Sequence, residues 1–304
     1  MIIIAHDRDV DGIGCHAILH RYCALNDLPV KHLFVNYDDF CSKLAEIKGT
    51  TGEIIIVADL GCSDMITGCM HDLEEAGSKN ELRWFDHHDW SGITRPKNAE
   101  MNLDMLKCAA ELVEEEYLPG DEVASRIASL ARAQDYMGAD ELAWKLYDVI
   151  SAGFDKSTLI DLLSRGVFWN DEIEASYMKY QNLRKSGFAY LDEHSKLYGI
   201  GDWKCLLGFS KPYLSSTIAS GHLLEKNPDF VICVYPSGKL SFRRNNQEVD
   251  LRSIATLFGG GGRDAAAGGH YGAKVTEDDY LKVFDEIMER ISLAYSRLRG
   301  ISME

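Results

Sequence analysis

The chain has 304 residues, of which 46% are hydrophobic and 26% are charged, and its formal net charge is −16. This length exceeds what one hydrophobic core usually serves, so we expect about two domains, and the composition excludes an intrinsically disordered chain. A net charge this negative would repel a long nucleic-acid backbone if it were spread evenly over the surface.

The charge is not spread evenly along the chain. Residues 196–275 contain ten Lys and Arg against six Asp and Glu, a net charge of +4, which leaves −20 for the rest of the chain. The sequence therefore divides into an acidic body and a mildly basic module.

The sequence lacks the signals of a membrane or secreted protein. No apolar run approaches the roughly 18 residues that a membrane-spanning helix needs, and the start, MIIIAHDRDVDG, has no basic region before its short apolar stretch. We therefore expect a cytoplasmic protein with no membrane partner. The cysteines form no C-x-x-C pair and mostly lie in apolar segments, which indicates reduced core thiols. They are Cys15, Cys23, Cys41, Cys62, Cys69, Cys108, Cys205 and Cys233.

The first half of the chain alternates short β-branched runs with longer helical stretches. The runs lie at residues 2–5, 32–36, 53–58 and 82–86. This alternation is typical of a parallel sheet, in which ligands bind beyond the carboxyl ends of the strands. The residues directly after these runs are therefore the ones to examine for chemistry.

The second half begins as helices and ends as another α/β module. Residues 105–194 have helical patterns, several of which open with an acid suited to a helix N-terminus, and 170–194 indicates one long connecting helix. The pattern then changes to strand-like pieces, a loop and a final amphipathic helix. The strand-like pieces are residues 203–209, 229–236 and 239–244, and the loop is GGGGRDAAAGG at 259–269.

Three acids alternate directly after the first run, in the segment HDRDVDG at residues 6–12. As the backbone turns, Asp7, Asp9 and Asp11 come within reach of one another, and carboxylates this close need a divalent cation to offset their repulsion. Gly12 allows a tight turn into the next helix. Taken alone, the same segment could be an acidic surface turn.

The third and fourth runs are followed by similar side chains. Asp59 stands at the end of the third run, where an acid could equally cap the following helix. The fourth run leads into Asp86-His87-His88-Asp89, which supplies imidazole ligands together with carboxylates that can orient them. A tetrapeptide of this kind can also be a polar loop.

The coincidence of these motifs at one sheet edge favours a metal site. Two divalent ions about 3.5–4 Å apart, bridged by a shared carboxylate and activating a hydroxide, are the arrangement expected for phosphoryl hydrolysis. Mixed histidine and carboxylate ligation suits Mn²⁺ better than Mg²⁺. We therefore expect two divalent ions, Mn²⁺ before the alternatives Mg²⁺ and Co²⁺.

The motifs HDRDVDG, VADLG and DHH, in this order and spacing, resemble those of the DHH phosphoesterase superfamily of RecJ nucleases, nano-RNases, cyclic-dinucleotide phosphodiesterases and type II pyrophosphatases. The segments LSFRRN and GGGGRDAAAGG resemble the DHH-associated substrate domain of its nuclease branch. This resemblance covers nearly the whole chain. It implies an α/β protein with a parallel-sheet DHH domain and helical connector at 1–190, a smaller α/β substrate-binding domain at 191–304, and an active site in the cleft between them.

The resemblance also implies a role for each motif residue. Asp59 would bridge two ions. His6 and Asp9 would complete the ligands of the first ion, and Asp11, His87 and Asp135 would complete those of the second. His88 would face the substrate phosphate or leaving oxygen, with Asp86 behind the ligands. The implied metal ligands are His6, Asp9, Asp11, Asp59, His87 and Asp135.

Two positions in this assignment have alternatives. Asp135 matches its motif only as an acid after a helical run, and Asp140 competes for the same role. Asp7 matches the first acid of the RecJ-like form and could be a ligand or merely adjacent.

The basic module supplies the expected substrate contacts. A glycine loop brings backbone N–H groups close to a phosphate, and Arg243 and Arg263 can grip phosphate oxygens. Arg263 stands where the family usually has histidine, which leaves the particular substrate open. The loop residues expected to bind substrate are Gly260, Gly261 and Gly262.

The predicted activity is manganese-dependent hydrolysis of short RNA or DNA oligonucleotides, or of single-strand ends, to nucleoside 5′-monophosphates. The acidic body favours small substrates. Alternatives are a phosphodiesterase for cyclic or linear dinucleotides and a non-catalytic scaffold of a replication or repair complex, although the intact ligand set favours catalysis. Polarity, sugar preference and oligomeric state, including a homodimer, stay open.

Overall fold

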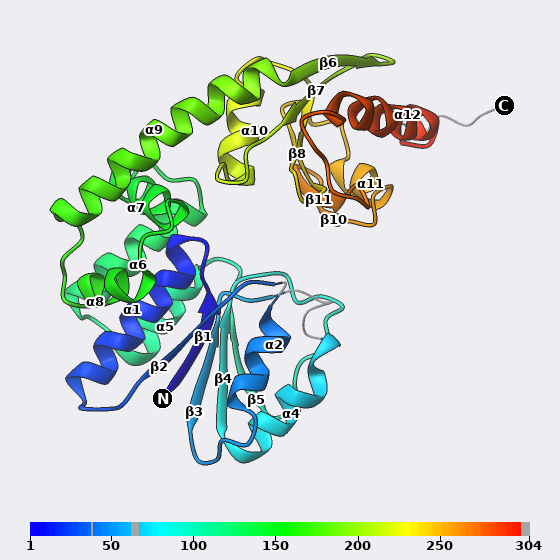
Figure 1. Cartoon of the computed structure of the whole chain (residues 1–304). Helices are drawn as coiled ribbons and strands as arrows, with labels where there is room; N and C mark the ends of the chain where they lie inside the picture. The colour runs from blue at the N-terminus through cyan, green and yellow to red at the C-terminus, as the bar shows by residue number, and fades with distance from the viewer. Residues whose placement is uncertain (38, 62–66, 299–304) are drawn as a thin grey trace. The chain divides into compact units, whose positions relative to one another are not determined.

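The computed structural model describes residues 1–37, 39–61 and 67–298, without the side chains of 296–298. The chain divides into two compact units, Met1–Tyr180 and Gln181–Glu304 (Figure 1). The division falls on α9 (Asp171–Glu193), the long connecting helix that the sequence predicts, and the predicted boundary at residue 190 lies on the same helix.

The first unit is built on a five-stranded sheet in the order β2-β1-β3-β4-β5, with every pair of neighbouring strands parallel. The β-branched runs predict four of these strands correctly, because strands buried on both faces consist of near-continuous apolar residues. The fifth carries the mixed sequence AEMNL at the sheet edge and has no such signal. The strands are β1 (Ile2–His6), β2 (Lys31–Val35), β3 (Ile54–Ala58), β4 (Glu81–Asp86) and β5 (Ala99–Leu103).

Helices cover both faces of this sheet (Figure 1). On one face, α2 (Phe40–Leu44), η1 (Ala45–Ile47) and α4 (Met70–Lys79) pack against a core that includes the buried Trp84. On the other, helix α1 (Val10–Leu25), which is buried over residues 10–19, lies among three more helices. These are α5 (Ala109–Tyr117), α6 (Glu122–Asp135) and α8 (Lys156–Ser164).

Acids begin the helices as the sequence predicts. The side chains of Asp121, Asp140 and Asp155 accept hydrogen bonds from backbone amides at the starts of α6, α7 (Glu141–Ser151) and α8. These bonds satisfy amides that the first turn of a helix leaves without a partner. The acids therefore set where the helices begin.

The second unit contains a six-stranded sheet in the order β10-β11-β9-β8-β7-β6, in which only β7 and β8 form a parallel pair. Helices α11 (Leu251–Thr256) and α12 (Tyr280–Leu298) pack on one face, and α10 (Ser216–Leu224) packs on the other with the end of α9. The strands are β6 (Ser195–Ile200), β7 (Trp203–Phe209), β8 (Phe230–Val234), β9 (Lys239–Arg244), β10 (Gly261–Arg263) and β11 (Ala266–His270).

The prediction of a plain loop at residues 259–269 is wrong. Strands β10 and β11 form a hairpin there, and β11 pairs with β9. The glycines permit unusually close backbone contact, since a Cβ on Gly260 would fall 1.9 Å from the carbonyl oxygen of Gly268. Pairing of this kind uses backbone groups, so the side-chain pattern gives no strand signal.

The cysteine and membrane predictions are tested over the described residues only. There, Cys41 is half-buried, and the other described cysteines are buried thiols, while Cys62 lies outside that range. The buried thiols are Cys15, Cys23, Cys69, Cys108, Cys205 and Cys233. Within the same range, no helix combines the length and apolar character needed to cross a membrane.

Candidate metal centre

The register of the sheet brings the ends of three strands to one edge. Ala58 pairs with Ala5 of β1 and with Phe85 of β4, so the next residue along each strand lies at the same carboxyl edge. Those next residues are His6, Asp59 and Asp86.

Asp59 has the left-handed backbone conformation, with φ of 54°. Aspartate tolerates this conformation better than most residues, and the Asp59 amide is held by the carbonyl oxygen of Phe85 at 3.0 Å. The chain thus turns sharply just where the third run ends, and the Asp59 side chain is buried there.

Asp59 lies between two histidines that come from different strands. Its Oδ2 atom is 3.5 Å from His6 Nδ1, and its Oδ1 atom is 3.5 Å from His87 Nε2. Each carboxylate oxygen therefore faces one imidazole. This placement is the one expected of a carboxylate that is shared between two metal ions.

The first group of donors is formed by β1 and the turn that follows it. The Nδ1 atom of His6 lies 2.7 Å from Asp9 Oδ2. The other oxygen of Asp9 accepts the Gly12 amide at 3.0 Å and so caps α1. Donor atoms of His6, Asp9 and Asp59 all lie within 4.8 Å of one another.

The second group gathers around His87. Its Nε2 atom is 3.8 Å from Asp11 Oδ2, and its Nδ1 atom is 3.4 Å from Asp135 Oδ2. Asp11 is fully buried and accepts the amides of Ala109 and Ala110 at 2.8 and 2.7 Å. The N-terminus of α5 therefore holds this carboxylate, a support that sequence motifs do not reveal.

The charges of these groups are strongly coupled. Burial opposes the charged form of His6, but the charge of Asp9 and contacts with both neighbouring carboxylates raise the pKa of His6 to about 11. Burial likewise opposes the charged form of His87, yet Asp59 and Asp11 raise its pKa to about 9. Burial and the charge of Asp59 together raise the pKa of Asp11. Without a bound cation, the clustered carboxylates therefore keep protons on the two histidines.

A further observation indicates that these donor atoms suit a divalent cation. The Oδ2 atom of Asp59 is buried and accepts no hydrogen bond, because His6 is beyond ordinary bonding distance. Buried carboxylate oxygens rarely lack a partner unless a proton or cation supplies one. Carboxylate oxygens and imidazoles together are suitable ligands for ions such as Mn²⁺.

His88 is oriented by a buried carboxylate. Its Nδ1 atom lies 2.7 Å from Asp86 Oδ1, while the Trp90 indole donates to Asp86 Oδ2 at 2.6 Å. The other ring nitrogen of His88 lies 3.3 Å from the hydroxyl of Tyr37. Both oxygens of Asp86 thus have partners, although Asp86 and His88 also lie within 4.8 Å of donor atoms of Asp59 and His87.

Sequence reasoning missed Trp90 and Tyr37. Trp90 follows the DHH motif closely and could have been noticed as a donor for a buried acid. Tyr37 comes from the segment after β2, and only the fold brings it to His88. Gly61 is also required, because a Cβ there would lie 2.2 Å from Asp86 Oδ2.

The two alternative acids have other partners. Asp7 forms an ion pair with Lys156 and lies 3.3 Å from Arg8. Asp140 caps α7 and pairs with Arg126 at 2.9 Å. Of Asp135 and Asp140, Asp135 is therefore the acid that lies beside His87.

A pocket of about 350 Å³ lies in the second unit, and all of its lining residues belong to that unit. It is open and is lined by Arg243 and Lys239 of β9, by Gly261 and Gly262 of β10, and by residues from other elements. The predicted contacts Gly260 and Arg263 do not line it, because Gly260 packs against Gly268. The remaining lining residues are Ser216, Leu240, Ser241, Ala266, Ala267 and Gly268.

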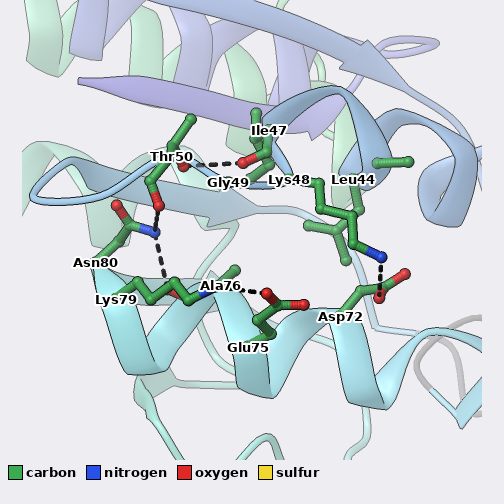
Figure 2. Close-up of a pocket in the computed structure, with 11 residues that line it drawn as sticks. Leu44, Ile47, Lys48, Gly49, Thr50, Asp72, Glu75, Ala76, Lys79 and Asn80 are labelled. Atoms are coloured by element: carbon green, nitrogen blue, oxygen red, sulfur yellow. Dashed lines mark hydrogen bonds and ion pairs between the residues drawn. The ribbon is translucent and has the colours of Figure 1, made fainter.

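Another pocket lies at the opposite, amino end of β3 and β4 (Figure 2). Its space of about 20 Å³ holds about one water. Lys48 pairs with Asp72 at 3.8 Å, and Lys79 pairs with Glu75 at 2.6 Å. The same two acids form a donor group with His71, but lysines already neutralise them. We interpret this pocket as a packing gap.

No family model and no curated protein sequence matches the chain. Solved structures match it over nearly its whole length. A pGpG-specific phosphodiesterase from Vibrio cholerae is 14% identical, with 95% of this chain and 98% of that chain covered and a TM-score of 0.56. RecJ from Thermus thermophilus in complex with Mn²⁺ is 17% identical, with 97% and 52% covered and a TM-score of 0.64.

The DHH domain of a protein assigned to a family of ribosomal proteins is 13% identical, with 96% of this chain and 86% of that chain covered and a TM-score of 0.66. The chain thus has the fold of the DHH superfamily, and the predicted α/β fold class is confirmed. It spans about half the length of the Thermus thermophilus RecJ chain. At these identities the likeness establishes the fold, and the chemistry depends on the site.

Proposed function

We propose that the chain is a DHH-superfamily phosphodiesterase that hydrolyses short oligonucleotides or single-strand ends to nucleoside 5′-monophosphates. The observation that carries this proposal is the position of Asp59, whose two oxygens each lie 3.5 Å from a different histidine. The solved structures with this fold include a phosphodiesterase and a manganese-bound RecJ, which agrees with that chemistry.

The proposed ligands divide into two sets that share Asp59. His6 and Asp9 would hold one ion, and the acids around His87 would hold the other. Bound divalent ions supply Lewis-acid activation of a phosphoryl oxygen and lower the pKa of a water. The assignment of these residues as metal ligands stays a prediction. The predicted ligands are His6, Asp9, Asp11, Asp59, His87 and Asp135.

His88 would act on the substrate rather than on the metal. Asp86 accepts the Nδ1 proton and so fixes the ring, which leaves Nε2 to donate to a phosphoryl or leaving oxygen. Burial opposes the charged ring, but its hydrogen bond to Asp86 and the charges of Asp86 and Asp59 together raise the pKa of His88. Tyr37 would share the contact with this nitrogen.

The pocket of the second unit would bind another phosphate or the nucleotide end of the substrate. Arg243 and Lys239 supply positive charge, and glycine backbones allow close approach. An active site in the cleft between the domains stays a prediction, as do the roles of Gly260 and Arg263.

A timed digestion tests the proposal. End-labelled RNA and DNA oligomers of graded length, with either end blocked, are incubated with the protein and Mn²⁺. We expect nucleoside 5′-monophosphates from wild type and a loss of at least about 100-fold in rate for Asp59→Asn. Asp161→Asn, which changes an exposed acid paired with Arg165, serves as the matched control. Equal rates for all three proteins would remove the proposal.

A dinucleotide phosphodiesterase is the second candidate. The pGpG-specific phosphodiesterase has this fold and is matched over 98% of its length. Comparing turnover of a cyclic dinucleotide, its linear form and a longer oligomer separates the two candidates, and the manganese content of the purified protein tests the scaffold alternative.

A further inference from the structure

Four large apolar residues are exposed on two segments of the first unit, one of which directly follows Asp135, and we call them the apolar rim. Met105 and Leu106 come from the loop between β5 and α5, and Tyr136 and Met137 follow the end of α6. Between 42% and 78% of each residue is exposed. Such a group on a surface needs an explanation, because scattered single apolar residues are the usual case.

Hydrogen bonds join the two segments of the rim. The Tyr136 hydroxyl lies 3.0 Å from the carbonyl oxygen of Met105 and 3.1 Å from that of Lys107, and it can donate to either. Arg132 donates to the carbonyl oxygen of Leu106 at 3.0 Å and lies over the Tyr136 ring, 4.8 Å from its centroid. The exposed side chains therefore stand on a fixed backbone.

Met137 has a backbone conformation that favours glycine, with φ of 57°. The amides of Met137 and Gly138 bond to the carbonyl oxygens of Gln134 and Ala133, the pattern that ends a helix with a left-handed residue. A methionine is strained there, yet the residue is 69% exposed and is not part of the core. Strain kept for an exposed side chain points to a ligand contact.

The rim adjoins the donor group around His87. Asp135, 3.4 Å from His87, directly precedes Tyr136, and the rings of Tyr136 and His87 are 6.2 Å apart between centroids. A phosphodiester bound at the metal centre carries a nucleoside on each side, so a base lies one sugar away. A stable protein interface uses roughly 20–30 residues a side, whereas four side chains match one planar ring.

We propose that the apolar rim binds a nucleobase of the substrate, with the ring lying against Met137 and Leu106. This inference rests on the proposed phosphodiesterase function and adds recognition of one base to it. Methionine sulfur makes favourable contacts with aromatic rings, and its flexible side chain fits any base. The rim should therefore favour substrates that carry a base without selecting a sequence.

The test compares kcat/KM with Mn²⁺ for a linear dinucleotide and for two analogues that each lack one base. Wild type should prefer the intact dinucleotide over one of the analogues. Met137→Gly and Leu106→Ser should reduce that preference by about 2-fold to 10-fold, the range expected for one contact between a methionine sulfur and an aromatic ring. Met178→Ala, a change at a methionine 50% exposed on α9, should keep the wild-type preference.

The outcomes separate this inference from the proposed function. The urea midpoint of Met137→Gly should equal or exceed that of wild type, because glycine suits the helix end, so misfolding does not explain a lower preference. Unchanged preferences in both rim variants would overturn base binding while leaving the phosphodiesterase intact. A wild-type protein that cleaves neither these three substrates nor the oligomers of graded length would overturn both.

Discussion

At the scale of single residues, the candidate site depends on supports behind the motif residues. Asp86 is fully buried, and its two oxygens are held by His88 and Trp90. Asp11 is held by two amides of α5. Motifs predict the groups that face a ligand, since their chemistry is visible in the sequence. Motifs do not predict the groups that hold the ligand-facing side chains in place, since these supporting contacts depend on packing.

Replacing Trp90 with phenylalanine tests this support. The change removes the donor to a buried carboxylate, so we expect the free energy of unfolding to fall by about 2–3 kcal/mol. Urea unfolding measures it. Trp169→Phe removes a similar indole donor from Glu174 at an exposed site and should cost less than about 1 kcal/mol. Equal losses in the two variants would show that the buried bond adds no particular stability.

At the scale of elements, local chemistry and long-range pairing differ in how well the sequence predicts them. The β-branched runs of β1 and β3 and the capping acid Asp121 act within a few residues, so the sequence shows them. Strands β5, β10 and β11 exist through pairing with distant strands, and their small or polar residues show little of it. The same limit hides Tyr37 from any motif.

Packing of α1 on β2 places three histidines together. His16 of α1 lies 3.0 Å from His32 of β2, nitrogen to nitrogen, and His32 lies 3.0 Å from His20 of α1. Burial and the neighbouring His20 lower the pKa of His32 to about 4. Burial, His32 and Lys156 also lower the pKa of His16. Both His16 and His32 are therefore neutral in the folded protein at pH 7.

Acidification should destabilise this contact. Below the unfolded pKa of about 6.5, the unfolded chain binds protons that the neutral rings of the folded protein do not bind. The free energy of unfolding therefore falls by about 1.4 kcal/mol per pH unit for each ring. Stability from this source is complete above that pH and falls until about pH 4, where His32 begins to bind its proton when folded. Urea unfolding at pH 7.5, 6.0 and 5.0 should show a flatter decline for His32→Gln than for wild type. Parallel declines would contradict the lowered pKa.

At the scale of the whole molecule, the proposed ligands all belong to the first unit, while the basic pocket belongs to the second. The charge asymmetry of the sequence corresponds to this division, since residues 196–275 lie entirely in the second unit. Each unit has its own hydrophobic core. Binding of a metal ion should therefore stabilise one unit directly.

Calorimetry with and without Mn²⁺ tests this division of roles. An ion that binds only the folded first unit adds about 2.7 kcal/mol of stability when its free concentration is 100 times its Kd. We expect Mn²⁺ to raise the Tm of one unfolding transition and a chelator to reverse the change, with Asp59→Asn showing neither effect. Asp161→Asn should behave like wild type. If Mn²⁺ instead shifts Asp59→Asn as much as wild type, the ions bind elsewhere, and the shared-carboxylate centre is wrong even though the fold stands.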